Sequence, residues 1–169
     1  HLKNHVAGLP FSKVDPNDKQ AGAKHMFNFN AAIAVDDLDL RNFDCDTGAL
    51  GKNGEPVHVE RHFLIDHIRR LYYVERLEVD PKPVNTDNPD QVRLKEALYP
   101  IREPFDLTGT GFTYNRYLDP ARQDDSWLYY PLLKRARRLS TAARSEALFG
   151  QDTDIDSYGG YAGNIAWMD

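Results

Sequence analysis

The sequence predicts a mainly β protein of the α+β class, built on an antiparallel sheet. Residues 119–139 show a hairpin pattern, in which an Asp-Pro turn precedes an aromatic run at 126–130 and a basic run at 135–139. Residues 107–118 alternate with a period of two, and β-branched and aromatic residues dominate 57–79. Because turns separate these runs, we expect successive strands to pair with their neighbours in an antiparallel meander.

One helix is predicted ahead of the sheet. Asp15 suits the N-cap of a helix and Pro16 its first position. We expect this helix to end before Asp36, with an apolar side formed by Ala21, Ala23, Met26, Phe27 and Ala31.

The middle of the chain predicts further strands and turns. Residues 38–42 alternate leucine with charged residues, which indicates a half-exposed strand, and glycines at 48, 51 and 54 mark a turn region. Between 57 and 79, some apolar residues fit the two-residue period of a strand and others fit the spacing of a helix. We predict two strands there, because β-branched and aromatic residues dominate the segment and the prolines at its end would break a helix. Residues 80–93 are predicted to form a loop or mobile flap, and Gly109 and Gly111 indicate a bend.

Length and composition restrict the possible functions. The 169 residues suit a single domain, 1–169, which can bury roughly 70% of its unfolded surface. A net charge of −5 argues against general nucleic-acid binding, and Cys45, the only cysteine, excludes a disulfide framework within the chain. No apolar run approaches the roughly 18 residues that cross a bilayer. Because the chain starts at His1 and ends at Asp169 without a cap or polar tail, we expect it to be part of a longer protein.

No residue pattern predicts catalysis or a metal site. His58, Glu60 and His62 would share one face of a strand, but about 13 Å would separate the two histidines, too far for one ion. The chain has no Gly-x-Ser-x-Gly motif, and aspartates on both sides of Cys45 would raise the pKa of its thiol. Adjacent carboxylates at 36–37 and 124–125 would point to opposite faces. We therefore expect a non-enzymatic protein without cofactor or metal.

Four aromatic residues on adjacent predicted strands form the first candidate site. Ordinary core packing explains such a set by default. If the sheet curls and is loosely covered, the same face becomes the wall of a cavity for a hydrophobic ligand, where an acyl chain gains roughly 0.8 kcal/mol per buried methylene. The residues are Phe112, Tyr114, Trp127 and Tyr129.

A basic cluster on the return strand of the hairpin forms the second candidate site. Arg135 and Arg137 would share one face and Arg138 the other, with Lys134 before them and Arg144 further on. Charge that protects a solvated edge strand is the simplest explanation. Alternatively, the cluster binds anionic groups, such as lipid headgroups or the acidic face of a partner.

Motifs at both ends of the chain together resemble those of one protein family. The resemblance is carried at the N-terminus by Gly8-Leu9-Pro10-Phe11, Asp15-Pro16 and Gly22-Ala23-Lys24. In the second half it is carried by Gly109-Thr110-Gly111-Phe112-Thr113-Tyr114, Asp119-Pro120, Gln123 to Tyr129, Pro131, Arg135 to Leu139, Ser140-Thr141, Arg144-Ser145, Gly150-Gln151-Asp152, Asp156 and Gly159-Gly160-Tyr161.

These motifs resemble a bacterial family of unknown function that is distantly related to outer-membrane lipoprotein-sorting (LolA-like) proteins. The resemblance implies a curved antiparallel sheet, an open half-barrel with one or more helices packed in its mouth. It also implies export to the periplasm of Gram-negative bacteria. It implies lipid-like cargo and no enzymatic activity. Our leading hypothesis is therefore a periplasmic carrier for lipid or other hydrophobic molecules, with peripheral membrane contact. The alternative is an interaction module that docks an envelope transporter of the resistance-nodulation-division (RND) type through the basic hairpin. An anionic-polymer binder comes third, and nucleic acid is not an expected partner.

Overall fold

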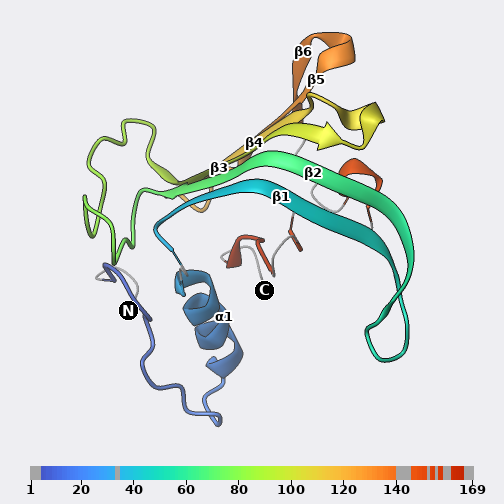
Figure 1. Ribbon diagram of the computed structural model, residues 1–169. Coiled ribbons are helices and arrows are strands. Elements are labelled where there is room, and N and C mark those ends of the chain that lie inside the picture. Colours follow the sequence, from blue (N-terminus) through green and yellow to red (C-terminus); the bar gives the residue numbers. More distant parts are fainter. Residues whose placement is uncertain are drawn as a thin grey trace.

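A computed structural model describes residues 5–32, 35–139, 146–151, 153–154, 156–157 and 161–165. In this part of the chain, six strands form one antiparallel sheet in the order β1-β2-β3-β4-β5-β6, so each strand pairs with the next along the sequence. The sheet is curved and open, with β1 and β6 at its edges, and α1 lies on its concave side (Figure 1). The predicted fold class and the meander are confirmed. The elements are α1 (Ala21–Ala31), β1 (Asp37–Leu50), β2 (Pro56–Tyr72), β3 (Val92–Glu103), β4 (Gly111–Tyr117), β5 (Asp125–Tyr130), β6 (Arg135–Leu139) and the 3-10 turns η2 (Phe105–Leu107), η3 (Pro131–Leu133) and η5 (Leu148–Gly150).

The helix α1 begins later than predicted. Asp15 accepts a hydrogen bond from the backbone N–H of Asn17 at 2.9 Å, so its carboxylate stabilises a turn that precedes the helix. Within α1, the Asn28 side chain donates to the carbonyl of Phe11 at 2.7 Å and accepts from its N–H at 2.9 Å. A residue that is a poor helix former therefore holds the N-terminal segment against the helix.

The strands β1 and β2 are longer than predicted, because the sheet bends without losing its pairing. Residues 57–79 do not form two strands; β2 continues to Tyr72. Its buried residues step from Phe63 and Ile65 to Ile68, a spacing of three instead of two. At the same level of the sheet Asn42 in β1 has φ 52°. The register with β1 is the same on both sides of this bend. In both strands, therefore, the alternation of core-facing and outward-facing residues shifts by one position at the same level.

The alternation of core-facing residues shifts in the third strand as well. In β3, Leu98 and Ile101 are both buried on the core face, although they are three positions apart and a regular strand would place them on opposite faces. Pro100 lies between them, and proline has no N–H to donate to the strand ladder. The bend therefore crosses β1, β2 and β3 at one level, and β3 is a central strand for which the sequence analysis made no prediction.

The segment between β2 and β3 is an ordered loop that is fixed by two charged residues. Arg76 is buried and donates to Asp37 at 2.7 and 2.9 Å and to the carbonyls of Tyr72 and Pro81 at 2.6 and 2.8 Å. Asp36 accepts hydrogen bonds from three consecutive backbone N–H groups of this loop. A loop was predicted for 80–93, but it starts at residue 73, and Val92 belongs to β3.

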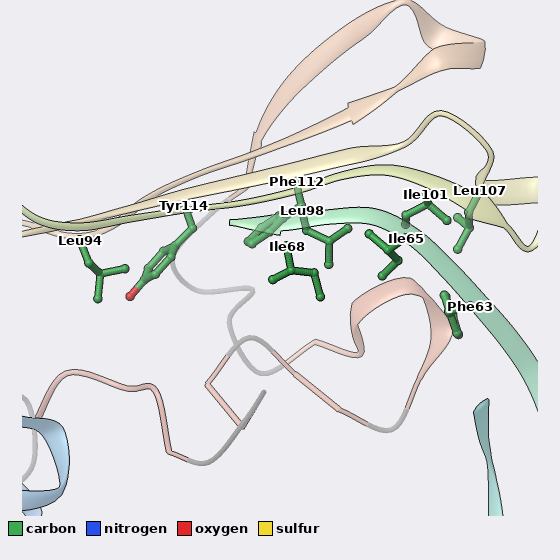
Figure 2. Close-up of a cluster of buried hydrophobic side chains, with 9 residues drawn as sticks. All are labelled: Phe63, Ile65, Ile68, Leu94, Leu98, Ile101, Leu107, Phe112 and Tyr114. Carbon is green, nitrogen blue, oxygen red and sulfur yellow. The ribbon is translucent and has the colours of Figure 1, made fainter. Parts of the chain in front are cut away.

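The hydrophobic core lies on the concave face of the sheet. Figure 2 shows its side chains projecting from the same face toward the chain beneath the sheet. The predicted strand at 107–118 is shorter in the structure, because residues 108–110 form a turn before β4 in which Gly109 has φ 79°. The core residues are Phe63, Ile65, Ile68, Leu94, Leu98, Ile101, Leu107, Phe112 and Tyr114.

Candidate binding groove

A groove of about 670 Å³ lies between the concave face of the sheet, the end of α1 and the C-terminal segments. Strand pairing places an apolar row along its floor, because Leu40 pairs with Ile68, Ile68 with Leu98 and Leu98 with Phe112. Residues directly opposite each other in an antiparallel pair project from the same face. The side chains of Phe43 and Leu148 extend this apolar lining.

The next row across the sheet is largely polar. Leu38 pairs with Arg70, Arg70 with Glu96 and Glu96 with Tyr114. Arg70 donates to Glu96 at 2.6 Å. Burial opposes the charge on Arg70, but the Glu96 carboxylate, with smaller contributions from Tyr72 and Tyr114, outweighs it, so the pKa of the guanidinium is raised. This charged pair therefore stands at the border of the apolar strip.

Two further arginines line the same end of the groove, and both are held by carboxylates. Arg93 donates to Glu75 at 2.5 Å. Arg116 is buried, donates to Asp124 at 3.0 Å and to the carbonyl of Ala162 at 2.5 Å, and stacks over the ring of Tyr114. The groove thus has an apolar end and an end rich in hydrogen-bonding groups.

The prediction that the four aromatic residues share one face of the sheet is wrong. Phe112 and Tyr114 are buried on the concave face and line the groove. Trp127 and Tyr129 pair with Thr113 and Gly111, which places them on the opposite, convex face. The sequence analysis missed the groove residues of β1, β2 and β3, although the alternation at 38–42 had indicated which face of β1 is apolar. These residues are Leu40, Phe43, Ile68, Arg70, Leu98 and Glu96.

The basic cluster lies on the edge strand β6 with the predicted alternation. Arg137 pairs with Leu128 and Arg135 with Tyr130, whereas Arg138 pairs with Trp127 on the convex face. Arg138 also forms an ion pair with Asp125. Lys134, Arg135 and Arg137 are exposed and have no ion-pair partner among the residues that the structure describes. Arg144 lies outside the described residues.

His62 and Cys45, two of the residues weighed for metal binding and catalysis, both lie beside aspartates. His62 hydrogen-bonds Asp46 at 2.8 Å, which raises the pKa of this histidine. No group of three or more His, Cys, Asp or Glu side chains in the described ranges is arranged to hold a metal ion. Burial, together with Asp44 and Asp46, raises the pKa of the Cys45 thiol, which disfavours the thiolate.

These features define an open, curved, mainly β protein with an amphiphilic groove on its concave face. The whole chain, residues 1–169, matches the family described as "Protein of unknown function (DUF1329)", and the protein belongs to that family. No curated protein and no solved structure matches the sequence. None of the helices in the described ranges is long and apolar enough to cross a membrane.

Proposed function

We propose that the protein is a non-enzymatic binding or carrier protein for lipid or another hydrophobic cargo, with the groove as the binding site. The observation that carries this proposal is the apolar row across β1 to β4, which stands beside ion-paired arginines in one groove. Its volume of about 670 Å³ is in the range of small-molecule sites. The proposal includes a periplasmic location and a kinship with lipoprotein-sorting (LolA-like) proteins, which are supported by the sequence resemblance alone.

The arrangement of the groove suits an amphiphile better than a purely apolar molecule. A hydrocarbon chain would lie against Leu40, Ile68 and Leu98, where each buried methylene contributes about 0.8 kcal/mol before ordering costs. A polar head would lie near Arg70 and Asn30, because groups there can donate or accept hydrogen bonds. Binding of this kind needs no catalytic residue.

The first test is whether the protein carries cargo. Protein purified without detergent should show bound lipid in native mass spectrometry and after solvent extraction. Delipidated protein should take up a fluorescent long-chain fatty acid. A clean apo mass together with no uptake would reject the proposal.

The second test locates the cargo with a matched pair of substitutions. Leu40 in the groove and Tyr129 on the convex face are 40% and 42% exposed, so a glutamate at either position can reach solvent without forcing the core open. Leu40→Glu places a carboxylate against the apolar row and should weaken uptake about tenfold or more. Tyr129→Glu should leave uptake unchanged. Equal loss in both variants would place the cargo elsewhere.

A further inference from the structure

The tip of the β5–β6 hairpin carries exposed apolar side chains beside unpaired cations. Leu132 in η3 is 90% exposed, and Leu133 next to it is also exposed. Phe105 in η2 is 94% exposed. Gly109, two residues after η2, lies against Pro131, the first residue of η3, because a Cβ built on Gly109 would lie 2.9 Å from Cγ of Pro131. The two turns that carry these three large apolar side chains therefore lie at the same end of the sheet.

The cations follow the apolar tip directly in the chain. Lys134, Arg135 and Arg137 are exposed and unpaired within the described ranges, whereas Arg138 is neutralised by Asp125. Asp106, the acidic residue next to Phe105, forms an ion pair with Arg61. The hairpin therefore presents three uncompensated positive charges, and Figure 1 shows it extending away from the rest of the sheet.

We propose that this hairpin tip, formed by Leu132, Leu133 and the cations at 134, 135 and 137, together with Phe105, binds the surface of an anionic lipid bilayer. In the interfacial region of a bilayer, apolar side chains enter the acyl boundary while Lys and Arg contact anionic headgroups. A single exposed leucine needs no explanation, but apolar residues at a projecting tip with unpaired cations match both layers of this interface. An acidic protein face would satisfy the cations and leave Leu132 in water.

The hairpin is joined to the groove by the strand register. Phe112 on the groove floor pairs with Leu128, and Leu128 pairs with Arg137, so the inner face of the sheet continues into the hairpin. A membrane at the tip would lie at the edge of the face that carries the groove. The inference does not depend on the groove binding lipid, because the tip binds the bilayer by its own side chains.

Flotation of the full chain with vesicles tests this inference. The protein should float with vesicles of phosphatidylcholine that contain about 30% phosphatidylglycerol, and much less with phosphatidylcholine alone, because the negative surface attracts the cations. High salt should weaken the association. Absence of binding to the anionic vesicles would overturn the proposal, as would binding to an acidic protein with none to vesicles.

Two paired variants separate insertion from charge attraction. Leu132→Ser with Leu133→Ser, and Arg135→Gln with Arg137→Gln, should each reduce partitioning about tenfold. A matched control is Leu50→Ser with Lys52→Gln at the β1–β2 turn, where Leu50 is 69% exposed, and it should bind like the wild type. Full binding by the leucine variant would show charge attraction only and overturn the proposal.

A gain-of-signal variant does not depend on the loss of binding. Leu132→Trp should give a blue-shifted emission with anionic vesicles when the wild-type spectrum is subtracted, and an unshifted emission would contradict insertion. Fatty-acid uptake in solution is measured in parallel with the leucine and arginine variants. Unchanged uptake with lost flotation shows that the tip and the groove act separately, so failure of one proposal is distinguished from failure of the other.

Discussion

At the scale of single residues, Asp36 connects the sheet with the long β2–β3 loop. It is 3% exposed and accepts hydrogen bonds from the N–H groups of Leu77 at 3.0 Å and of Glu78 and Val79 at 2.7 Å. Burial opposes ionisation, but the three backbone donors, with a contribution from Arg76, lower the pKa of the carboxyl below its ordinary value. The carboxylate therefore stabilises the folded state as an anion.

We expect Asp36→Asn to reduce the free energy of unfolding by about 2 kcal/mol at neutral pH. An amide places donors against the N–H groups of the loop and loses the charge-assisted bonds. Because the folded-state pKa of Asp36 lies below the unfolded value, its stabilisation is complete above about pH 4 and is lost as the pH falls through the lower folded-state value. Urea unfolding of both proteins at about pH 7 and about pH 3 measures this.

The control for this substitution is Asp90→Asn, which changes an exposed carboxylate at the other end of the loop. It should alter the stability by no more than about 0.5 kcal/mol. If Asp36→Asn unfolds like the wild type at neutral pH, or if the deficit stays the same in acid, the carboxylate does not hold the loop.

The faces of individual aromatic residues were not predictable from the sequence, because register decides them. Trp127 and Phe112 would share a face if β4 and β5 were paired one residue out of their actual register. In the structure, Phe112 pairs with Leu128, and the side chain of Tyr130 projects from the same face as these two. Because all three pack into the core, Trp127 lies on the convex face. The alternation of Arg135, Arg137 and Arg138 was predictable, because it depends on one strand alone.

At the scale of elements, the bend across β1, β2 and β3 explains why the segment at 57–79 resisted interpretation. Periodicity arguments assume that a strand keeps its faces, but Ile65 and Ile68 are both on the core face. The helical spacing in the sequence was therefore the signature of a bent strand. The sequence predicted the fold class and the pairing of successive strands, but it predicted two strands where β2 is one and it did not predict β3. Local alternation does not reveal a bend that three strands make together.

The left-handed backbone of Asn42 gives a test of this bend. Valine favours strands but not a positive φ, so Asn42→Val should lower the stability by about 1–2 kcal/mol, whereas Asn42→Gly should be neutral or slightly stabilising. Ala49→Val is the control, since it adds a β-branched side chain to an exposed position of the same strand. Urea unfolding of the three variants measures the differences. Wild-type stability in Asn42→Val would show that the bend does not require this conformation.

At the scale of the whole molecule, the groove joins parts of the chain that are distant in sequence. Its lining includes Phe29 of α1, the inner faces of β1 to β4, and Leu148 and Tyr161 near the C-terminus. The helix and the C-terminal segments lie on the concave side of the sheet, so cargo in the groove would contact all three regions (Figure 1). A ligand held in this way binds the folded chain only, because unfolding separates the regions that form the site.

Cargo should therefore raise the thermal stability of the protein. A long-chain fatty acid at about 100 times its Kd adds about 2.7 kcal/mol to the free energy of unfolding, which for a chain of this length corresponds to a rise in Tm of about 5–10 °C. Differential scanning fluorimetry measures the shift. At the same fatty-acid concentration Leu40→Glu should at least halve the shift, because a tenfold weaker site gains only about 1.4 kcal/mol, and Tyr129→Glu should retain it, since only the first residue lies in the groove. An equal shift with a short-chain acid at the same concentration would mean that charge alone is recognised, because the affinity expected of the apolar row grows with each methylene that it buries.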